Sequence, residues 1–108
     1  MVREKLLRLR ASTEAEAATL AQNLEALFTA SRDSNADDEH DPEGATIGFE
    51  RAQLTALLAT ARERIAEVDD ALRRMDTATY GICERCRQPI AEERLAARPF
   101  ARYCMACA

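Results

Sequence analysis

The stretch LTALLATARERIAEVDDALRRM, residues 54–75, decides the expected fold, because its apolar side chains recur at alternating steps of four and three. This is the spacing of a coiled-coil seam, in which one face of a helix packs along a partner helix. The seam positions are Leu54, Leu58, Ala61, Ile65, Val68, Leu72 and Met75. The pattern predicts a long second helix that ends at Gly81, a residue type common just after helices.

An earlier stretch of the chain shows the same step and predicts the partner helix. Its positions are Leu6, Thr13, Ala17, Leu20, Leu24 and Leu27, with Arg10 interrupting the register. Thr13 and Glu16 also have the spacing of a capping box. The first dozen residues are therefore either the start of this helix or a separate helical piece.

An acidic segment that favours a turn lies between the two helical stretches. Residues 33–43, DSNADDEHDPE, hold six acids and no Lys or Arg, and Ser, Asn and Asp favour turns. Asp41 and Pro42 have the pattern of an N-cap followed by the first helical residue. A loop of roughly residues 34–41 makes the two helices antiparallel neighbours. Since one chain can then satisfy its own seam, we expect a monomer.

Composition narrows the class of protein. The chain has 108 residues, 47% of them hydrophobic but only 5% aromatic, which favours helices over a β-sandwich. No run of about 18 apolar residues and no leader pattern occurs, so we expect a cytoplasmic protein without membrane association. The net charge of −4 lacks the basic footprint of duplex binding, and we expect no direct sequence-specific DNA binding.

All four cysteines fall in two Cys-x-x-Cys pairs, Cys83 with Cys86 and Cys104 with Cys107. Thiols stay reduced in the cytoplasm, and two such pairs are typical of one tetrahedral Zn²⁺ site. Four thiolates leave no open position on the metal, so the zinc is structural and no enzyme activity is expected. A redox role is the alternative, but no βαβ pattern surrounds either pair.

The segment from Gly81 onward has too few core-forming residues to fold alone. They are chiefly Ile82, Ile90, Leu95, Phe100 and Tyr103. Zinc binding can contribute about 10 kcal/mol to folding, so we expect this end to be disordered without metal. The predicted fold is all-α, with an antiparallel two-helix coiled-coil hairpin at residues 1–80 and a small four-cysteine zinc finger at residues 81–108.

The cysteine segment YGICERCRQPIAEERLAARPFARYC, residues 80–104, resembles the zinc-finger signature of the DksA/TraR family. In that signature Tyr-Gly-x-Cys-x-x-Cys leads through Ile and Arg-Leu to Ala-Arg-Pro and the second cysteine pair. A preceding helical hairpin with an acidic end extends the resemblance over nearly the whole chain. The resemblance implies a transcription regulator that binds RNA polymerase rather than DNA, with its coiled coil in the secondary channel and tip carboxylates near the catalytic magnesium.

The resemblance also assigns a polymerase-facing tip, comprising Asp37, Asp38, Glu39, Asp41 and Glu43. Asp38 and Asp41 match the family pattern Asp-x-x-Asp-x-Ala, whereas Glu43 stands where Ala is expected. Arg87 stands where many relatives have Gly, directly after the first cysteine pair. An Arg there costs on the order of 1 kcal/mol if the turn is left-handed.

Other interpretations of these features stay open. The acidic run could be only a solvated loop. The chain could instead be a zinc-ribbon nucleic-acid-binding protein that dimerises through its coiled coil, or a plain structural interaction module. A basic patch for such a role would come from Arg85, Arg87, Arg94, Arg98 and Arg102.

Overall fold

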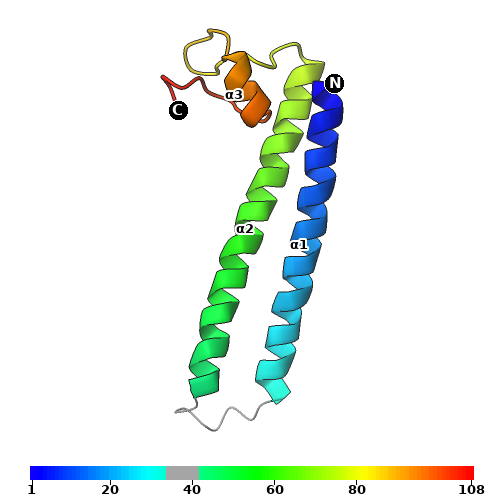
Figure 1. The fold of residues 1–108 in the computed structure, drawn as a ribbon, viewed down its shortest axis with the longest axis vertical. Coiled ribbons are helices and arrows are strands. Elements are labelled where there is room, and N and C mark those ends of the chain that lie inside the picture. Colours follow the sequence, from blue (N-terminus) through cyan, green and yellow to red (C-terminus); the bar gives the residue numbers. More distant parts are fainter. Residues whose placement is uncertain (34–41) are drawn as a thin grey trace. The chain divides into compact units, whose positions relative to one another are not determined.

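The computed structural model describes residues 1–33 and 42–108, with side chains described outside residues 31–45. Helix α1 spans Val2–Asp33, α2 spans Pro42–Asp76, and the short α3 spans Glu92–Ala97 (Figure 1). Helix α1 ends and α2 begins at the two residues that flank the predicted loop.

Outside the three helices, the described part of the chain consists of turns, irregular segments and one isolated antiparallel bridge between Ile82 and Pro89. The predicted fold class, a two-helix hairpin followed by a small cysteine-containing end, is confirmed. Among the described helices, none contains an apolar window long enough to cross a membrane.

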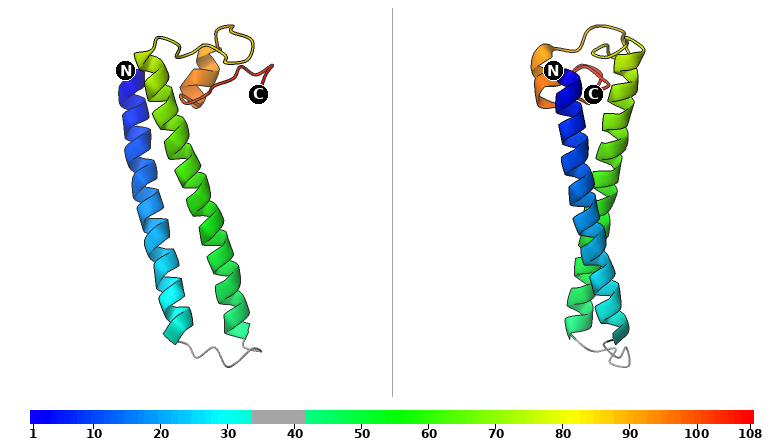
Figure 2. Two further views of the ribbon diagram at one scale, coloured as in Figure 1. Left: turned by 180° about the vertical axis from the view of Figure 1, so that it is seen from behind. Right: turned by 90° about the vertical axis from the view of Figure 1, so that its right-hand side faces the viewer.

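The chain packs as two compact units. Unit 1 comprises Met1–Thr13 and Glu63–Ala108, and unit 2 comprises Glu14–Arg62. Within each unit, a segment of α1 lies beside a segment of α2 and runs in the opposite direction (Figure 2). The domain boundary predicted at residue 81 stays a prediction.

Unit 1 has a small core to which both long helices and the cysteine segment contribute. Its buried members are Leu6 from α1, Val68 and Ala71 from α2, and Phe100 from beyond α3. Leu6 and Val68 have no exposed surface, and Phe100 is 5% exposed. Phe100 is therefore a core residue of the helix pair as well as part of the finger.

Arg10, which interrupts the predicted seam, is accommodated by an ion pair rather than by packing. Its Nε donates to Oδ1 of Asp69 on α2, and its Nη2 donates to Oδ2 at 3.3 Å. The Arg10 guanidinium holds the pKa of Asp69 below its usual value, although partial burial opposes this shift. The polar position in the seam thus has a specific partner on the facing helix.

The alternative of a separate N-terminal helical piece is wrong. Helix α1 runs without a break through Thr13, whose side chain is buried. The Thr13 hydroxyl donates to the carbonyl oxygen of Leu9 at 2.7 Å, a bond that Thr makes within a continuous helix. Its hydroxyl therefore supports the preceding turn and does not cap a new helix.

The predicted end of the second helix at Gly81 is also wrong, because α2 ends at Asp76. Ala78 is left-handed, with φ 60°, and closes the helix. The carbonyl oxygen of Arg74 then accepts from the backbone N–H groups of Thr79 at 2.9 Å and Tyr80 at 3.2 Å. Gly81, also left-handed with φ 81°, belongs to the turn that leads into the finger.

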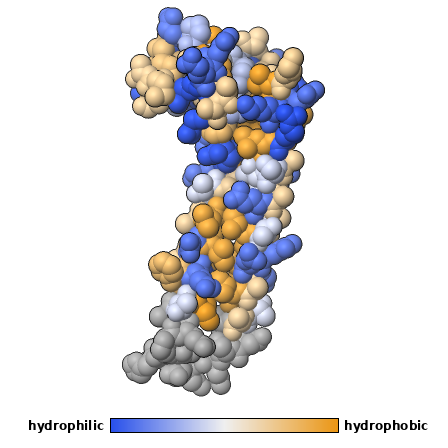
Figure 3. Space-filling view, viewed as in Figure 1, coloured by the Kyte–Doolittle hydropathy of each residue, from blue (hydrophilic) through white to orange (hydrophobic). Residues whose placement is uncertain are grey.

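The seam within unit 2 is only partly covered by the two helices. Leu58 and Ala61 are buried, whereas Leu20, Leu24 and Leu54 keep part of their surface exposed. Figure 3 shows hydrophobic side chains at the surface on one face of this unit. Two helices alone leave much of their shared apolar face in contact with solvent.

Candidate metal centre

The first cysteine pair lies in a tight turn held by backbone hydrogen bonds. The Cys83 N–H donates to the carbonyl oxygen of Gln88 at 2.8 Å, and the Arg87 N–H donates to that of Cys83 at 2.9 Å. Arg87 is left-handed, with φ 64°, so the backbone cost considered for an Arg at this position applies. The turn brings the sulfur atoms of Cys83 and Cys86 within 4.8 Å of each other.

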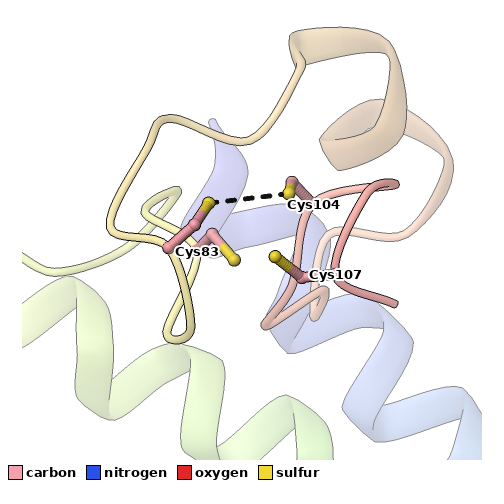
Figure 4. Close-up of side chains that lie close together, drawn as sticks. Cys83, Cys104 and Cys107 are labelled. Atoms are coloured by element: carbon pink, nitrogen blue, oxygen red, sulfur yellow. Dashed lines mark hydrogen bonds between the residues drawn. The ribbon is translucent and has the colours of Figure 1, made fainter.

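The second cysteine pair lies in a turn at the end of the chain. The N–H groups of Cys107 and Ala108 donate to the carbonyl oxygen of Cys104, at 3.1 and 2.9 Å. The sulfur atoms labelled in Figure 4, those of Cys83, Cys104 and Cys107, point into one common space. The two turns therefore face each other across this space.

The four sulfur atoms lie close enough together to share one metal ion. All four lie within 4.8 Å of one another, and the sulfur atoms of Cys86 and Cys104 are 3.7 Å apart. Zn–S bonds of about 2.3 Å in a tetrahedron put neighbouring sulfurs about 3.8 Å apart. The four cysteines are free thiols and are positioned to bind one metal ion.

The thiols of the centre differ in how easily they lose a proton. Backbone N–H groups, that of Cys86 first, donate to the sulfur of Cys83 and lower its pKa to about 6. In contrast, the Cys104 thiol and burial raise the pKa of Cys107 to about 12. Metal binding requires thiolates, so it releases the protons that the thiols still hold.

The charge of the finger matches the charge of such a centre. Residues 81–108 carry five arginines and three glutamates, which gives a formal charge of +2 with neutral thiols. Zinc held by four thiolates adds about two negative charges to the segment. A finger with bound zinc is therefore close to neutral, and its arginines offset the charge of the metal centre.

Arg74 is the main residue of this region that the sequence did not identify. Its side chain is 8% exposed and lies against the segment that leads into the second cysteine turn. It occupies a position outside the seam, in an ordinary charged stretch of α2. No periodic signal could separate it from its exposed neighbour Arg73.

The side chains of the predicted polymerase-facing tip lie outside the described part of the chain. Asp37, Asp38, Glu39 and Asp41 lie outside the described residues, and so does the side chain of Glu43. The tip assignment stays a prediction from the resemblance.

Comparison with known proteins places the finger in a family. Residues 78–108 match the prokaryotic dksA/traR C4-type zinc finger. General stress protein 16O of Bacillus subtilis is 39% identical over 69 residues, which cover 64% of this chain and 42% of that protein. The RNA polymerase-binding transcription factor DksA of Caulobacter vibrioides is 48% identical over 40 residues, which cover 37% of this chain and 28% of that protein.

A solved structure matches almost the whole chain. Transcription factor DksA2 from Pseudomonas aeruginosa superposes with a TM-score of 0.82 and 28% sequence identity, covering 98% of this chain and 76% of that one. The chain spans less than half the length of the curated relatives described above.

The fold and the four-cysteine centre define a zinc-finger protein built on a helical hairpin. The match of residues 78–108 to the dksA/traR C4-type zinc finger confirms the resemblance, and the four clustered cysteines are positioned for the one zinc ion expected. DksA of Caulobacter vibrioides and DksA2 of Pseudomonas aeruginosa are both named as transcription factors.

Proposed function

We propose that this protein regulates transcription by binding RNA polymerase directly. The observation that carries the proposal is the structural match to transcription factor DksA2, which extends over both long helices and the finger. A relative named as an RNA polymerase-binding transcription factor matches at 48% identity over 40 residues. A protein with this partner acts in the cytoplasm.

The proposed mode of action places the helical hairpin in the secondary channel of the polymerase, with the acidic tip near the active centre. Residues 33–43, from the last residue of α1 to the second residue of α2, hold six of the chain's 19 acidic residues. Carboxylates near a catalytic magnesium compete for the ion or reposition it, and a confined channel screens this interaction less than bulk water does.

The zinc ion has a structural role in this proposal. Cys83, Cys86, Cys104 and Cys107 are the proposed ligands because their sulfur atoms all lie within 4.8 Å of one another. With four thiolates bound, the ion keeps no position for water or substrate. The finger therefore supplies a folded surface and takes no part in chemistry.

The near neutrality of the zinc-loaded finger argues against the nucleic-acid-binding alternative. Nonspecific binding to nucleic acid depends on neutralising several phosphates, which a neutral module does poorly. Co-purification of polymerase, compared with a DNA shift assay across salt concentrations, separates the two functions. That the protein acts as a monomer stays a prediction.

The decisive experiment removes the tip carboxylates in the double variant Asp38→Asn/Asp41→Asn. We expect polymerase binding to persist within about threefold, because most binding energy comes from a few well-packed contacts elsewhere. The effect on transcription in vitro should fall. Asn caps helices about as well as Asp, so folding of α2 is preserved.

The matched control is Glu16→Gln/Glu50→Gln, which removes two exposed carboxylates from unit 2 outside the acidic segment. This control should retain the full effect on transcription. An unchanged effect from the folded, polymerase-bound tip variant would show that the acidic segment is only a solvated loop. Failure of the unaltered protein to bind polymerase would refute the proposed function itself.

A further inference from the structure

A strap of five residues, 99–103, is held by groups from several parts of unit 1. Each of its five carbonyl oxygens accepts a hydrogen bond from outside the strap. The donors are Tyr80 Oη to Pro99 (2.8 Å), Arg74 Nη2 to Phe100 (3.2 Å), Arg74 Nη1 to Ala101 (3.2 Å), the Glu84 backbone N–H to Arg102 (3.0 Å) and Arg94 Nε to Tyr103 (2.8 Å).

Arg74 makes the most buried of these contacts. Its guanidinium bonds two consecutive carbonyls while its Nε donates to Oδ2 of Asp70 at 3.0 Å. Glu84, from the first cysteine turn, approaches the same Nε at 4.0 Å. The planar fork of an arginine can make these bonds at once, and both carboxylates also pair with Arg102.

The strap leads directly into the second cysteine turn, because Tyr103 precedes Cys104. Its donors come from α2, from the turn after α2, from the first cysteine turn and from α3, and none of them is a cysteine side chain. Four of the five bonds come from groups other than the first cysteine turn. The position of Cys104 relative to α2 and α3 is thus set by contacts that need no metal.

We propose that Arg74 and Arg94 are positioning residues of the metal centre, which hold the strap and so place the second cysteine pair before the metal binds. The proposal rests on the four cysteines being the zinc ligands. It differs from the expectation drawn from the sequence, in which the whole finger is disordered without metal. Groups that orient metal ligands typically change metal affinity 10- to 100-fold when removed.

The first test measures metal affinity in Arg74→Met and Arg94→Met, with Arg73→Met as the matched control. Arg73 precedes Arg74 and pairs with the same Asp70, but its side chain is 71% exposed. Reduced, metal-free protein is titrated with Co²⁺, whose absorption reports thiolate ligands, and zinc then competes for the site. We expect about 10-fold or greater weakening in the first two variants. The control should stay within about twofold.

The second test asks whether the strap is ordered without metal. This measurement separates a positioning role from a general loss of stability. In metal-free protein, hydrogen exchange should show protection at the amides of Glu84 and Ala101, which donate to Arg102 and Arg98. Arg73→Met should keep this protection. Arg74→Met should lose it there while the amides of α2 stay protected. If Arg74→Met unfolds, the same exchange measurement is made on Arg94→Met, because Arg94 lies in the separate helix α3.

The outcomes separate the inference from the site on which it rests. Absence of a four-thiolate cobalt spectrum in the unaltered protein would refute the ligand assignment. If the four-thiolate cobalt spectrum is present but the metal affinities of Arg74→Met, Arg94→Met and Arg73→Met are equal, the positioning role is overturned and the ligand assignment stands. Lack of protection at the Glu84 and Ala101 amides in the unaltered metal-free protein would also overturn the positioning role.

Discussion

Replacing Phe100 with Ala tests whether the finger completes the core of the helix pair. Phe100 is 5% exposed and packs with Leu6, Val68 and Ala71 from the two long helices. The guanidinium carbons of Arg64 and Arg98 lie 4.4 and 5.2 Å from the centre of its ring. Truncation therefore removes both an apolar core contact and two cation–π contacts.

The expected loss follows from this burial. A buried Phe removes about 150–250 Å² from water, which at about 25 cal/mol per Å² corresponds to about 4–6 kcal/mol. Measured Phe→Ala changes in cores are about 3–5 kcal/mol. We therefore expect the free energy of unfolding of zinc-loaded protein to fall by about 4 kcal/mol, a large share of the stability of a small domain.

Urea unfolding of zinc-loaded protein, followed by far-ultraviolet circular dichroism, measures this loss. Hydrogen exchange then locates it, because the protection of α1 and α2 should fall in unit 1. Phe49→Ala is the matched control, since Phe49 is 73% exposed and its truncation should change stability by no more than about 0.5 kcal/mol. Equal effects of the two truncations, or a loss below about 1 kcal/mol at Phe100, would refute the shared core.

Two further changes test local features of unit 1. Arg87→Gly should relieve the left-handed backbone at φ 64° and stabilise the finger by up to about 1 kcal/mol, which zinc competition would register as up to about fivefold tighter binding; weaker binding would contradict the strain argument. Asp69→Asn should lower stability at pH 7 by at most about 1 kcal/mol, because the ion pair with Arg10 is partly exposed. Since that pair lowers the folded-state pKa of Asp69 from 3.8, its contribution is present above that value and is lost as pH falls through the lowered pKa. Unfolding curves of wild type and variant should therefore converge in acid, and a constant difference down to the lowest pH would argue against the ion pair.

The sequence determined the features that depend on local spacing. Apolar residues at steps of four and three require two helices with matching faces, and the short acidic segment between them requires an antiparallel pair. The spacing of the two Cys-x-x-Cys pairs likewise predicts metal binding, because each turn can present two thiolates to one ion. For these reasons the hairpin and the single metal site could both be predicted from residue spacing alone.

Only the tertiary structure decided how the elements are joined. In the sequence, Arg10 only interrupts the seam. The structure shows that it pairs with Asp69 on the facing helix. Whether Gly81 or Ala78 closed α2 depended on which carbonyls the following N–H groups could reach. Arg73 and Arg74 have the same residue type and neighbouring positions, yet one side chain is 71% exposed and the other 8%. The difference arises because residues 99–103 fold back against α2, and contacts between residues so far apart in the chain leave no periodic trace in the sequence.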